Sequence, residues 1–115
     1  MKREYDLSKL EELADGDREF VIDIVSTFLD HAPIQVKEIE EAFEQADYKM
    51  LGDVAHKLKP SLDLMGIDSL YKVIRLIEQC AKEETKQKEL PRIINEFTSI
   101  FEKVLDEIKS DYSSH

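Results

Sequence analysis

Hydrophobic residues recur every three or four positions along most of this chain. An α-helix turns by about 100° per residue, so this spacing gathers the apolar side chains on one helical face. The pattern is most regular in the last third of the sequence, at Leu90, Ile93, Ile94, Phe97, Ile100, Phe101, Val104, Leu105 and Ile108. It predicts amphipathic helices that share a core, because strands would show an alternating pattern instead.

Two helices are expected before residue 47. The first is short, is capped by Asp6 or Ser8 and ends at Gly16. Its apolar residues are Leu7, Leu10 and Leu13. The second begins at Asp17 and carries a longer apolar pattern. The residues of that pattern are Phe20, Val21, Ile24, Val25, Phe28, Ile39, Ala42, Phe43 and Ala46.

Two further helices are expected in the middle of the chain. Asp47 caps a helix over residues 48–65, and Gly66 closes it. Its core-facing residues are Leu51, Val54, Ala55, Leu58, Leu62 and Met65. Asp68 is expected to cap the next helix, whose apolar residues are Leu70, Val73, Ile74, Ile77 and Ala81. The charged segment Lys82–Glu89 has no clear periodicity and is predicted to be a solvated connection.

Two prolines fall inside predicted helices. Proline removes a backbone donor and clashes with the preceding turn of a helix. Pro33 therefore predicts a kink or a short break near residues 30–33. Pro60 lies in the helix over residues 48–65, and its missing N–H would have bonded the carbonyl of His56. The helix should bend or loosen at that histidine.

Four long helices with short connections predict an all-α fold. We expect an up-down-up-down four-helix bundle preceded by a short N-terminal helix. Residues 1–115 should form a single domain, because a chain of 115 residues that is 42% hydrophobic suits one core. Residues 109–115 are polar and are expected to fray.

Composition narrows the partners and the compartment. The net charge of −10 argues against nucleic acid or an anionic membrane surface as the main partner. Cys80 is the single cysteine, so an internal disulfide is impossible and a reducing compartment is expected. The chain has no apolar run long enough to span a membrane and no apolar signal-peptide core, which predicts a cytoplasmic protein.

The candidate chemistry lies at His56. On a helical wheel its side chain points about 140° away from the apolar line, beside Gly52, Lys59, Pro60 and Asp63. A neutral imidazole has a free lone pair at cellular pH and can act as a nucleophile. An exposed Lys59 could balance a newly attached anion. The same geometry also fits a surface histidine that is merely solvated.

A resemblance to a known family begins at this histidine. The residues that carry it are Ala55-His56-Lys57-Leu58-Lys59-Pro60-Ser61, Gly66 ten residues after the histidine, and Ile77-Glu78. They resemble the histidine-containing phosphotransfer (HPt) domain, the four-helix module of bacterial phosphorelays. The likeness extends to Leu7-Ser8-Lys9-Leu10, Gly16-Asp17, Phe28-Leu29 and Pro33, and so covers nearly the whole chain.

The resemblance implies a role for each residue around His56. His56 would accept the phosphoryl group, Lys59 would support that group, and Glu78 would accept a hydrogen bond from the other ring nitrogen. A carboxylate at Nδ1–H would fix the tautomer and leave Nε2 as the nucleophile. The family usually has glycine after the lysine, where this chain has Pro60, so the local backbone need not follow that of the family.

The resemblance also implies the partners. They would be the receiver domain of a response regulator, a hybrid sensor histidine kinase, or both, with a docking surface that includes Gly52, Pro60 and Asp63. The receiver would supply Mg²⁺ and most of the catalytic groups. The chain itself would be a phosphocarrier without a cofactor or nucleotide site, and not an enzyme.

Two alternatives remain open. An acidic helical bundle could be a protein-binding module whose histidine is never phosphorylated. It could also bind a metal, because Asp53-x-x-His56 resembles half of a carboxylate-bridged site, although such sites need the motif on two helices with ligands pointing inward. His31 and His115 lie on separate segments without zinc spacing, and no glycine-rich or Walker-type nucleotide loop is present.

Overall fold

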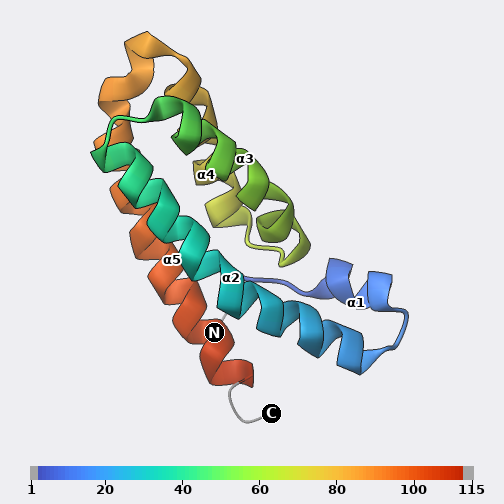
Figure 1. The fold of residues 1–115 in the computed structure, drawn as a ribbon. Coiled ribbons are helices and arrows are strands. Elements are labelled where there is room, and N and C mark those ends of the chain that lie inside the picture. Colours follow the sequence, from blue (N-terminus) through green and yellow to red (C-terminus); the bar gives the residue numbers. More distant parts are fainter. Residues whose placement is uncertain (1–2, 113–115) are drawn as a thin grey trace.

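The computed structural model describes residues 3–112. Their helices are α1 (Ser8–Ala14), α2 (Arg18–Glu44), α3 (Tyr48–Leu64), α4 (Asp68–Lys82), the 3₁₀ helix η1 (Glu84–Glu89) and α5 (Leu90–Tyr112). In Figure 1 the chain runs up along α2, down along α3, up along α4 and down along α5. α3 packs most extensively against α4, while α2 packs on α3 and α5 packs on α4. The predicted all-α bundle with a short N-terminal helix is confirmed.

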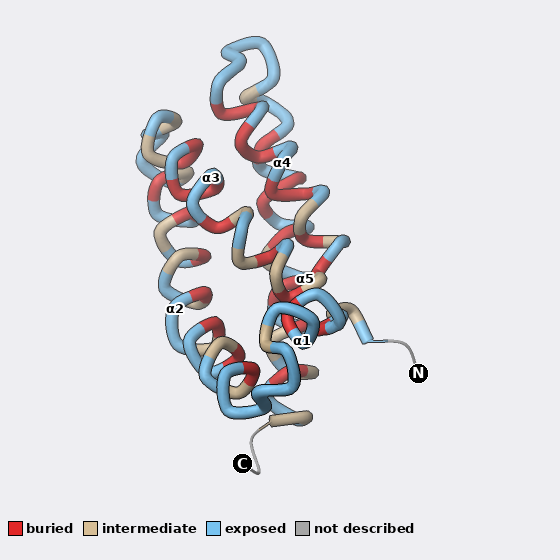
Figure 2. Tube along the Cα trace, turned by 90° about the vertical axis from the view of Figure 1, so that its right-hand side faces the viewer, coloured by how far each residue is buried: buried red, intermediate tan, exposed pale blue. Residues whose placement is uncertain are grey.

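One continuous core runs along the bundle, where the apolar faces of the helices meet. Each long helix contributes side chains with no exposed area, such as Ile39, Leu58, Ile74 and Phe97. Burying a side chain of this size contributes roughly 1.5–3 kcal/mol relative to leaving it in water. Figure 2 shows buried and exposed segments alternating along each helix, so α3 is held by one face while its other face meets solvent.

α2 begins after the cap at Asp17 as predicted, and it departs from the prediction at its proline, at its C-terminal end and at Phe20. The helix continues through Pro33 without a break, and Figure 1 shows its axis bending midway, so the kink occurs and the break does not. Ala46 was expected on the apolar face, but α2 ends at Glu44 and Ala46 lies in the connection with a φ of 54°. Phe20 is 42% exposed, because Val21 takes the core-facing position beside it.

The connections around α3 follow the prediction more closely than the start of α4 does. Asp47 accepts a hydrogen bond from the backbone N–H of Met50 and so caps α3. Gly66 follows the end of α3 with a φ of 63°, a conformation that favours glycine. The expectation that Asp68 caps α4 is wrong, because Asp68 is already the first helical residue and Ile67 occupies the cap position.

The last third of the chain is more helical than expected. The charged connection is largely the 3₁₀ helix Glu84–Glu89, which has no buried residue. α5 continues to Tyr112, which packs against the core, so fraying from residue 109 is not observed over the described part. Residues 113–115 lie outside the described residues.

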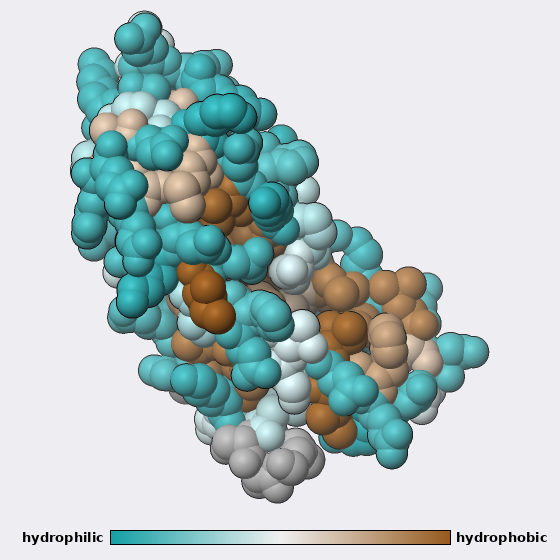
Figure 3. Space-filling view, in the orientation of Figure 1, coloured by the Kyte–Doolittle hydropathy of each residue, from teal (hydrophilic) through white to brown (hydrophobic). Residues whose placement is uncertain are grey.

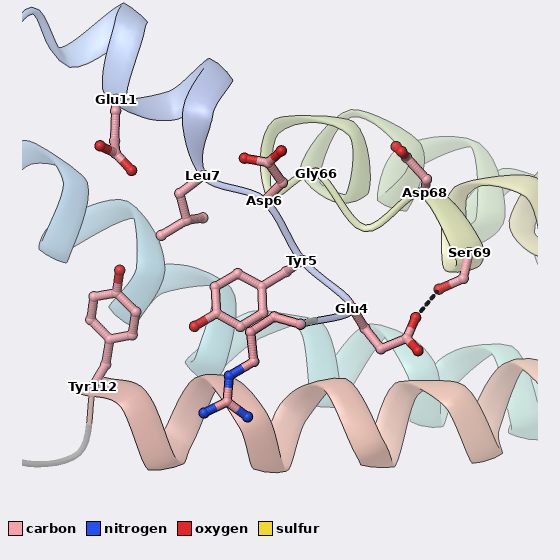
Figure 4. A pocket seen from close by; sticks show the side chains of 10 residues that line it. Glu4, Tyr5, Asp6, Leu7, Glu11, Gly66, Asp68, Ser69 and Tyr112 are labelled. Atoms are coloured by element: carbon pink, nitrogen blue, oxygen red, sulfur yellow. Dashed lines mark hydrogen bonds between the residues drawn. The ribbon is translucent and has the colours of Figure 1, made fainter. Parts of the chain in front are cut away.

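Residues 3–7 form a non-helical segment, here called the N-terminal strap, that contacts the connection between α3 and α4 and also α5. The backbone N–H of Asp6 donates to the carbonyl oxygen of Met65 at the end of α3, at 3.2 Å. Figure 4 shows the Glu4 carboxylate accepting a hydrogen bond from Ser69 in the first turn of α4.

On the surface, apolar side chains gather over α1 and the adjoining end of α2 (Figure 3).

Candidate functional site

His56 projects from the outer side of α3, as the helical wheel predicts. Its neighbours Val54, Ala55 and Leu58 are buried and fix the orientation of the helix. The side chain of His56 is 70% exposed. α3 is continuous through Pro60, and the bend expected at that proline stays a prediction.

A buried carboxylate on α4 holds one nitrogen of the His56 ring. Nδ1 of His56 lies 2.8 Å from Oε2 of Glu78, and the Glu78 side chain is only 11% exposed. An ionised carboxylate can only accept a hydrogen bond, so Nδ1 carries the hydrogen and the neutral ring keeps its lone pair on Nε2. Within residues 3–112 no group is hydrogen-bonded to Nε2, so the nitrogen with the lone pair is the one that faces solvent.

Two lysines share the Glu78 carboxylate with the histidine. Nζ of Lys59 lies 2.6 Å from Oε1, and Nζ of Lys82 lies 3.6 Å from Oε2. The hydrogen bond from Lys59 lowers the pKa of Glu78, burial opposes this shift, and the hydrogen bond to His56 lowers the pKa further. The carboxylate is therefore ionised at neutral pH, although it is almost fully enclosed.

The expectation that Lys59 stands free on the surface is wrong. Its side chain is only 23% exposed, because the ammonium group turns toward Glu78. Sequence reasoning also missed Lys82 as a neighbour of the site. The available signal was its position four residues after Glu78, a spacing that places two side chains on the same helical face. Glu78 itself falls within the apolar stripe of α4, which is a sign of burial.

The three residues predicted to line a docking surface have different environments. Pro60 is exposed beside His56. The side chain of Asp63 is 52% exposed and forms an ion pair with Lys9 of α1, with 2.5 Å between Oδ2 and Nζ. The placement of Gly52 on the exposed side is wrong, because Gly52 is buried and a Cβ there would lie 3.7 Å from the Cβ of Ala81. Gly52 belongs to the contact between α3 and α4.

The other histidines do not share this environment. His31 is exposed on α2, at a groove of about 170 Å³ between α2 and α3, and makes no hydrogen bond or ion pair within residues 3–112. His115 lies outside the described residues. Asp53, which belongs to the half-motif of a metal site, forms an ion pair with Lys49, with 3.5 Å between its Oδ2 and the lysine Nζ. Over the described range, no cluster of three His, Cys, Asp or Glu side chains could hold a metal ion.

The described part of the chain also contains no helix that is long and apolar enough to cross a membrane. This finding matches the charged outer faces of the helices, on which hydrophilic side chains dominate in the view of Figure 3.

Comparisons with known proteins agree with this arrangement. The sequence matches the Hpt domain family over residues 23–111, a stretch that contains His56, Lys59 and Glu78. The fold is similar to the HPT domain of a sensor hybrid histidine kinase from Shewanella, with a TM-score of 0.82, 21% sequence identity, and coverage of 97% of this chain and 96% of that one. Comparison with curated proteins gives no match. From the family match, this chain belongs to the Hpt domains, the family of histidine phosphotransfer in phosphorelays.

Proposed function

We propose that this chain carries a phosphoryl group on His56 and exchanges it with the aspartate of a receiver domain. One observation carries the proposal: a buried carboxylate holds one nitrogen of an exposed histidine, while the other nitrogen faces solvent. The receiver would belong to a response regulator, to a hybrid sensor histidine kinase, or to both in turn.

The transfer step follows from the tautomer of His56. Nε2 attacks the phosphorus of the aspartyl phosphate, so the N–P bond forms as the acyl O–P bond breaks and the aspartate carboxylate leaves with the electron pair. Nδ1 keeps its hydrogen, and the ring becomes positively charged. The Glu78 carboxylate, 2.8 Å from Nδ1, stabilises that charge. The reverse step uses the same atoms.

We propose that the main role of Lys59 is to bind the Glu78 carboxylate. Its hydrogen bond keeps the carboxylate ionised and oriented toward His56. Because the Lys59 side chain keeps 23% of its surface exposed, its ammonium group can also turn toward a dianionic phosphoryl group. Lys82, which is 70% exposed, is a second cation within reach of Glu78.

The chain would act as a phosphocarrier rather than as an enzyme. It contributes the nucleophile, the carboxylate that orients it and nearby cations. The receiver would contribute Mg²⁺, which neutralises the charge of the transferred group. Pro60 and Asp63 flank His56 on the exposed side of α3 and would meet the receiver there. We expect this exchange to take place in the cytoplasm, where phosphorelay receivers work.

Phosphorylation of the purified chain tests the proposal directly. The chain is incubated with receiver domains phosphorylated on aspartate, and the acid-labile phosphohistidine is measured. His56→Gln should reduce labelling below detection and leave the helical circular dichroism unchanged, because the side chain is exposed. His31→Gln and His115→Gln are the matched controls and should keep the wild-type rate.

Two outcomes would contradict the proposal. If His56→Gln is still labelled, another residue accepts the phosphoryl group. If the wild-type chain binds receivers tightly but is never labelled, it is a non-phosphorylated binding module.

A further inference from the structure

The charges of this chain are distributed unevenly between its helices. Residues 48–82, which contain α3 and α4, carry six Lys and Arg against four Asp and Glu, whereas the other 80 residues carry ten against 22. The α3–α4 hairpin is therefore net positive on a chain with a net charge of −10. Such a region attracts anionic surfaces that the rest of the molecule repels.

The positive charges gather in a groove along α4, and this groove is lined by Glu78, the hydrogen-bond partner of His56. This α4 groove has a volume of about 670 Å³, and its lining residues are Lys59, Lys72, Arg75, Leu76, Glu78, Gln79 and Lys82. Glu78 is the one acid among them, and it is buried and paired with Lys59 and His56. The charge that the groove presents to solvent is therefore cationic.

Three residues of the α4 groove, Lys72, Arg75 and Leu76, are exposed and suit contact with another protein. Lys72 and Arg75 are exposed and have no ion-pair partner within residues 3–112. Leu76 lies next to them and is 46% exposed, which is unusual for a leucine on this helix. From Lys72 to Lys82 the helix rises by about 15 Å. An apolar side chain framed by charges over this length fits a protein surface better than a small anion.

The opposite side of α3 offers a contrasting surface. α2 carries seven Asp and Glu against two basic residues, Arg18 and Lys37. The groove between α2 and α3 is lined mainly by apolar and uncharged side chains, with His31 as its one ionisable group. An acidic partner that approached His56 from this side would be repelled by α2.

We propose that the α4 groove is the docking surface for the acidic rim of the receiver domain, so that the receiver approaches His56 from the α4 side. This inference rests on the proposed function, because the partner is the protein that exchanges phosphoryl groups with His56. A receiver that binds Mg²⁺ next to its aspartate must present carboxylates around it. Lys72 and Arg75 provide the complementary charge, and Leu76 provides the apolar contact.

Charge reversal in matched pairs tests the docking surface. Lys72→Glu/Arg75→Glu changes the α4 groove, and Lys37→Glu/Lys109→Glu makes the same change in net charge on exposed positions of α2 and α5. The probe is the receiver domain that labels wild-type chain fastest, titrated in its unphosphorylated form with Mg²⁺ at low and at physiological salt. The groove pair should weaken binding at least tenfold and reduce its salt dependence, while the control pair should stay within twofold of wild type.

The outcomes separate this inference from the proposed function. If a receiver labels wild type but binds the groove variant and the control variant with equal affinity, the α4 groove is not the docking surface. The proposed phosphotransfer is unaffected by that result. If no receiver labels wild type, the proposed function itself fails. Inorganic phosphate, titrated under the same conditions, provides a third arm. If phosphate saturates the groove while the groove pair leaves receiver binding unchanged, the groove is only a small-anion site and the docking proposal is overturned.

Discussion

Two carboxylates, the buried one of Glu78 on α4 and the half-buried one of Asp111 on α5, organise two different regions of this molecule. Glu78 binds the ring of His56, and that set of contacts ends on a nitrogen that faces solvent. Asp111 accepts hydrogen bonds from the Tyr5 hydroxyl and from the Arg3 guanidinium, the latter at 2.8 Å, and both donors belong to the N-terminal strap. The first arrangement leaves a reactive group open, while the second fastens the chain to itself.

The two regions also differ in their electrostatics, because one contains a charged carboxylate beside a reactive ring and the other a neutral hydroxyl that donates a hydrogen bond. Lys59 lowers the pKa of Glu78, so the carboxylate stays ionised against a ring that becomes cationic when it is phosphorylated. Burial and the hydrogen bond to Asp111 raise the pKa of Tyr5, so its hydroxyl remains a hydrogen-bond donor to that carboxylate. Changes around Glu78 should therefore alter transfer, and changes around the N-terminal strap should alter stability alone.

The largest loss of stability is expected from Gly66→Ala. A Cβ on Gly66 would overlap the carbonyl oxygen of Asp6, and the φ of 63° already disfavours alanine. The N-terminal strap would have to leave the end of α3, at a cost of roughly 2–4 kcal/mol in the free energy of unfolding. Urea melts measure this loss. At a temperature where the variant is folded, phosphotransfer should be unchanged, because His56 is not part of this contact.

Gly16→Ala is the matched control for that variant. Gly16 has a φ of 87°, but a Cβ there would meet no atom of residues 3–112 within 4 Å. Only backbone strain is added, with an expected cost of about 1 kcal/mol. Equal losses for the two variants would show that the contact between Gly66 and Asp6 does not hold the strap.

The next largest effect is expected from Lys59→Met, on the other side of the comparison. Methionine keeps the aliphatic contacts but leaves the Glu78 carboxylate without its nearest cation. We expect a loss of about 1–3 kcal/mol in the free energy of unfolding and a transfer rate about tenfold lower. Lys82→Met is the control, because Lys82 is 70% exposed and 3.6 Å from Glu78, and should cost under about 1 kcal/mol. If Lys59→Met loses stability while transfer keeps the wild-type rate, Lys59 has a structural role only.

The helices could be predicted from the sequence because their signals are local. The periodicity of residues such as Leu51, Leu58 and Leu62 depends on one helix alone, and so does the cap at Asp47. Where a local signal was ambiguous, the prediction failed. Asp68 can serve either as a cap or in the first turn of a helix, and only the path of the chain after Gly66 decides between them.

The site could be predicted only in part, because a helical wheel describes one helix without its neighbours. His56 was placed correctly, since its side chain is 70% exposed among the described residues. Gly52 and Lys59 were placed in solvent on the same wheel, yet α4 packs against α3, Gly52 is buried and Lys59 keeps only 23% of its side chain exposed. Their environment depends on a contact between helices, and the periodicity of α3 contains no information about it.

The pH dependence of stability should distinguish Glu78 from an ordinary surface carboxylate. Its pKa is lowered in the folded state, chiefly by the hydrogen bond from Lys59. The stabilisation is therefore complete above the unfolded pKa of about 4.3 and is lost as the pH falls through the lower folded pKa. Urea melts of wild type should show a steeper loss of stability below about pH 5 than melts of Glu78→Gln. Parallel curves would mean that Glu78 gains nothing from its partners on folding.

The smallest effect is expected from Gly52→Ala, a change in the contact between α3 and α4. A Cβ on Gly52 would make an ordinary contact with Ala81 at 3.7 Å, so alanine fits without a shift of α4. Helix propensity then predicts a gain of up to about 1 kcal/mol, with unchanged phosphotransfer. Gly52→Gln makes the contrast, because its longer side chain must leave the contact between α3 and α4 on the side of His56. We expect that variant to transfer more slowly in the same labelling assay. If alanine alone slows transfer as much as glutamine does, the receiver must pack directly over Gly52, and the position would belong to the docking surface despite its burial.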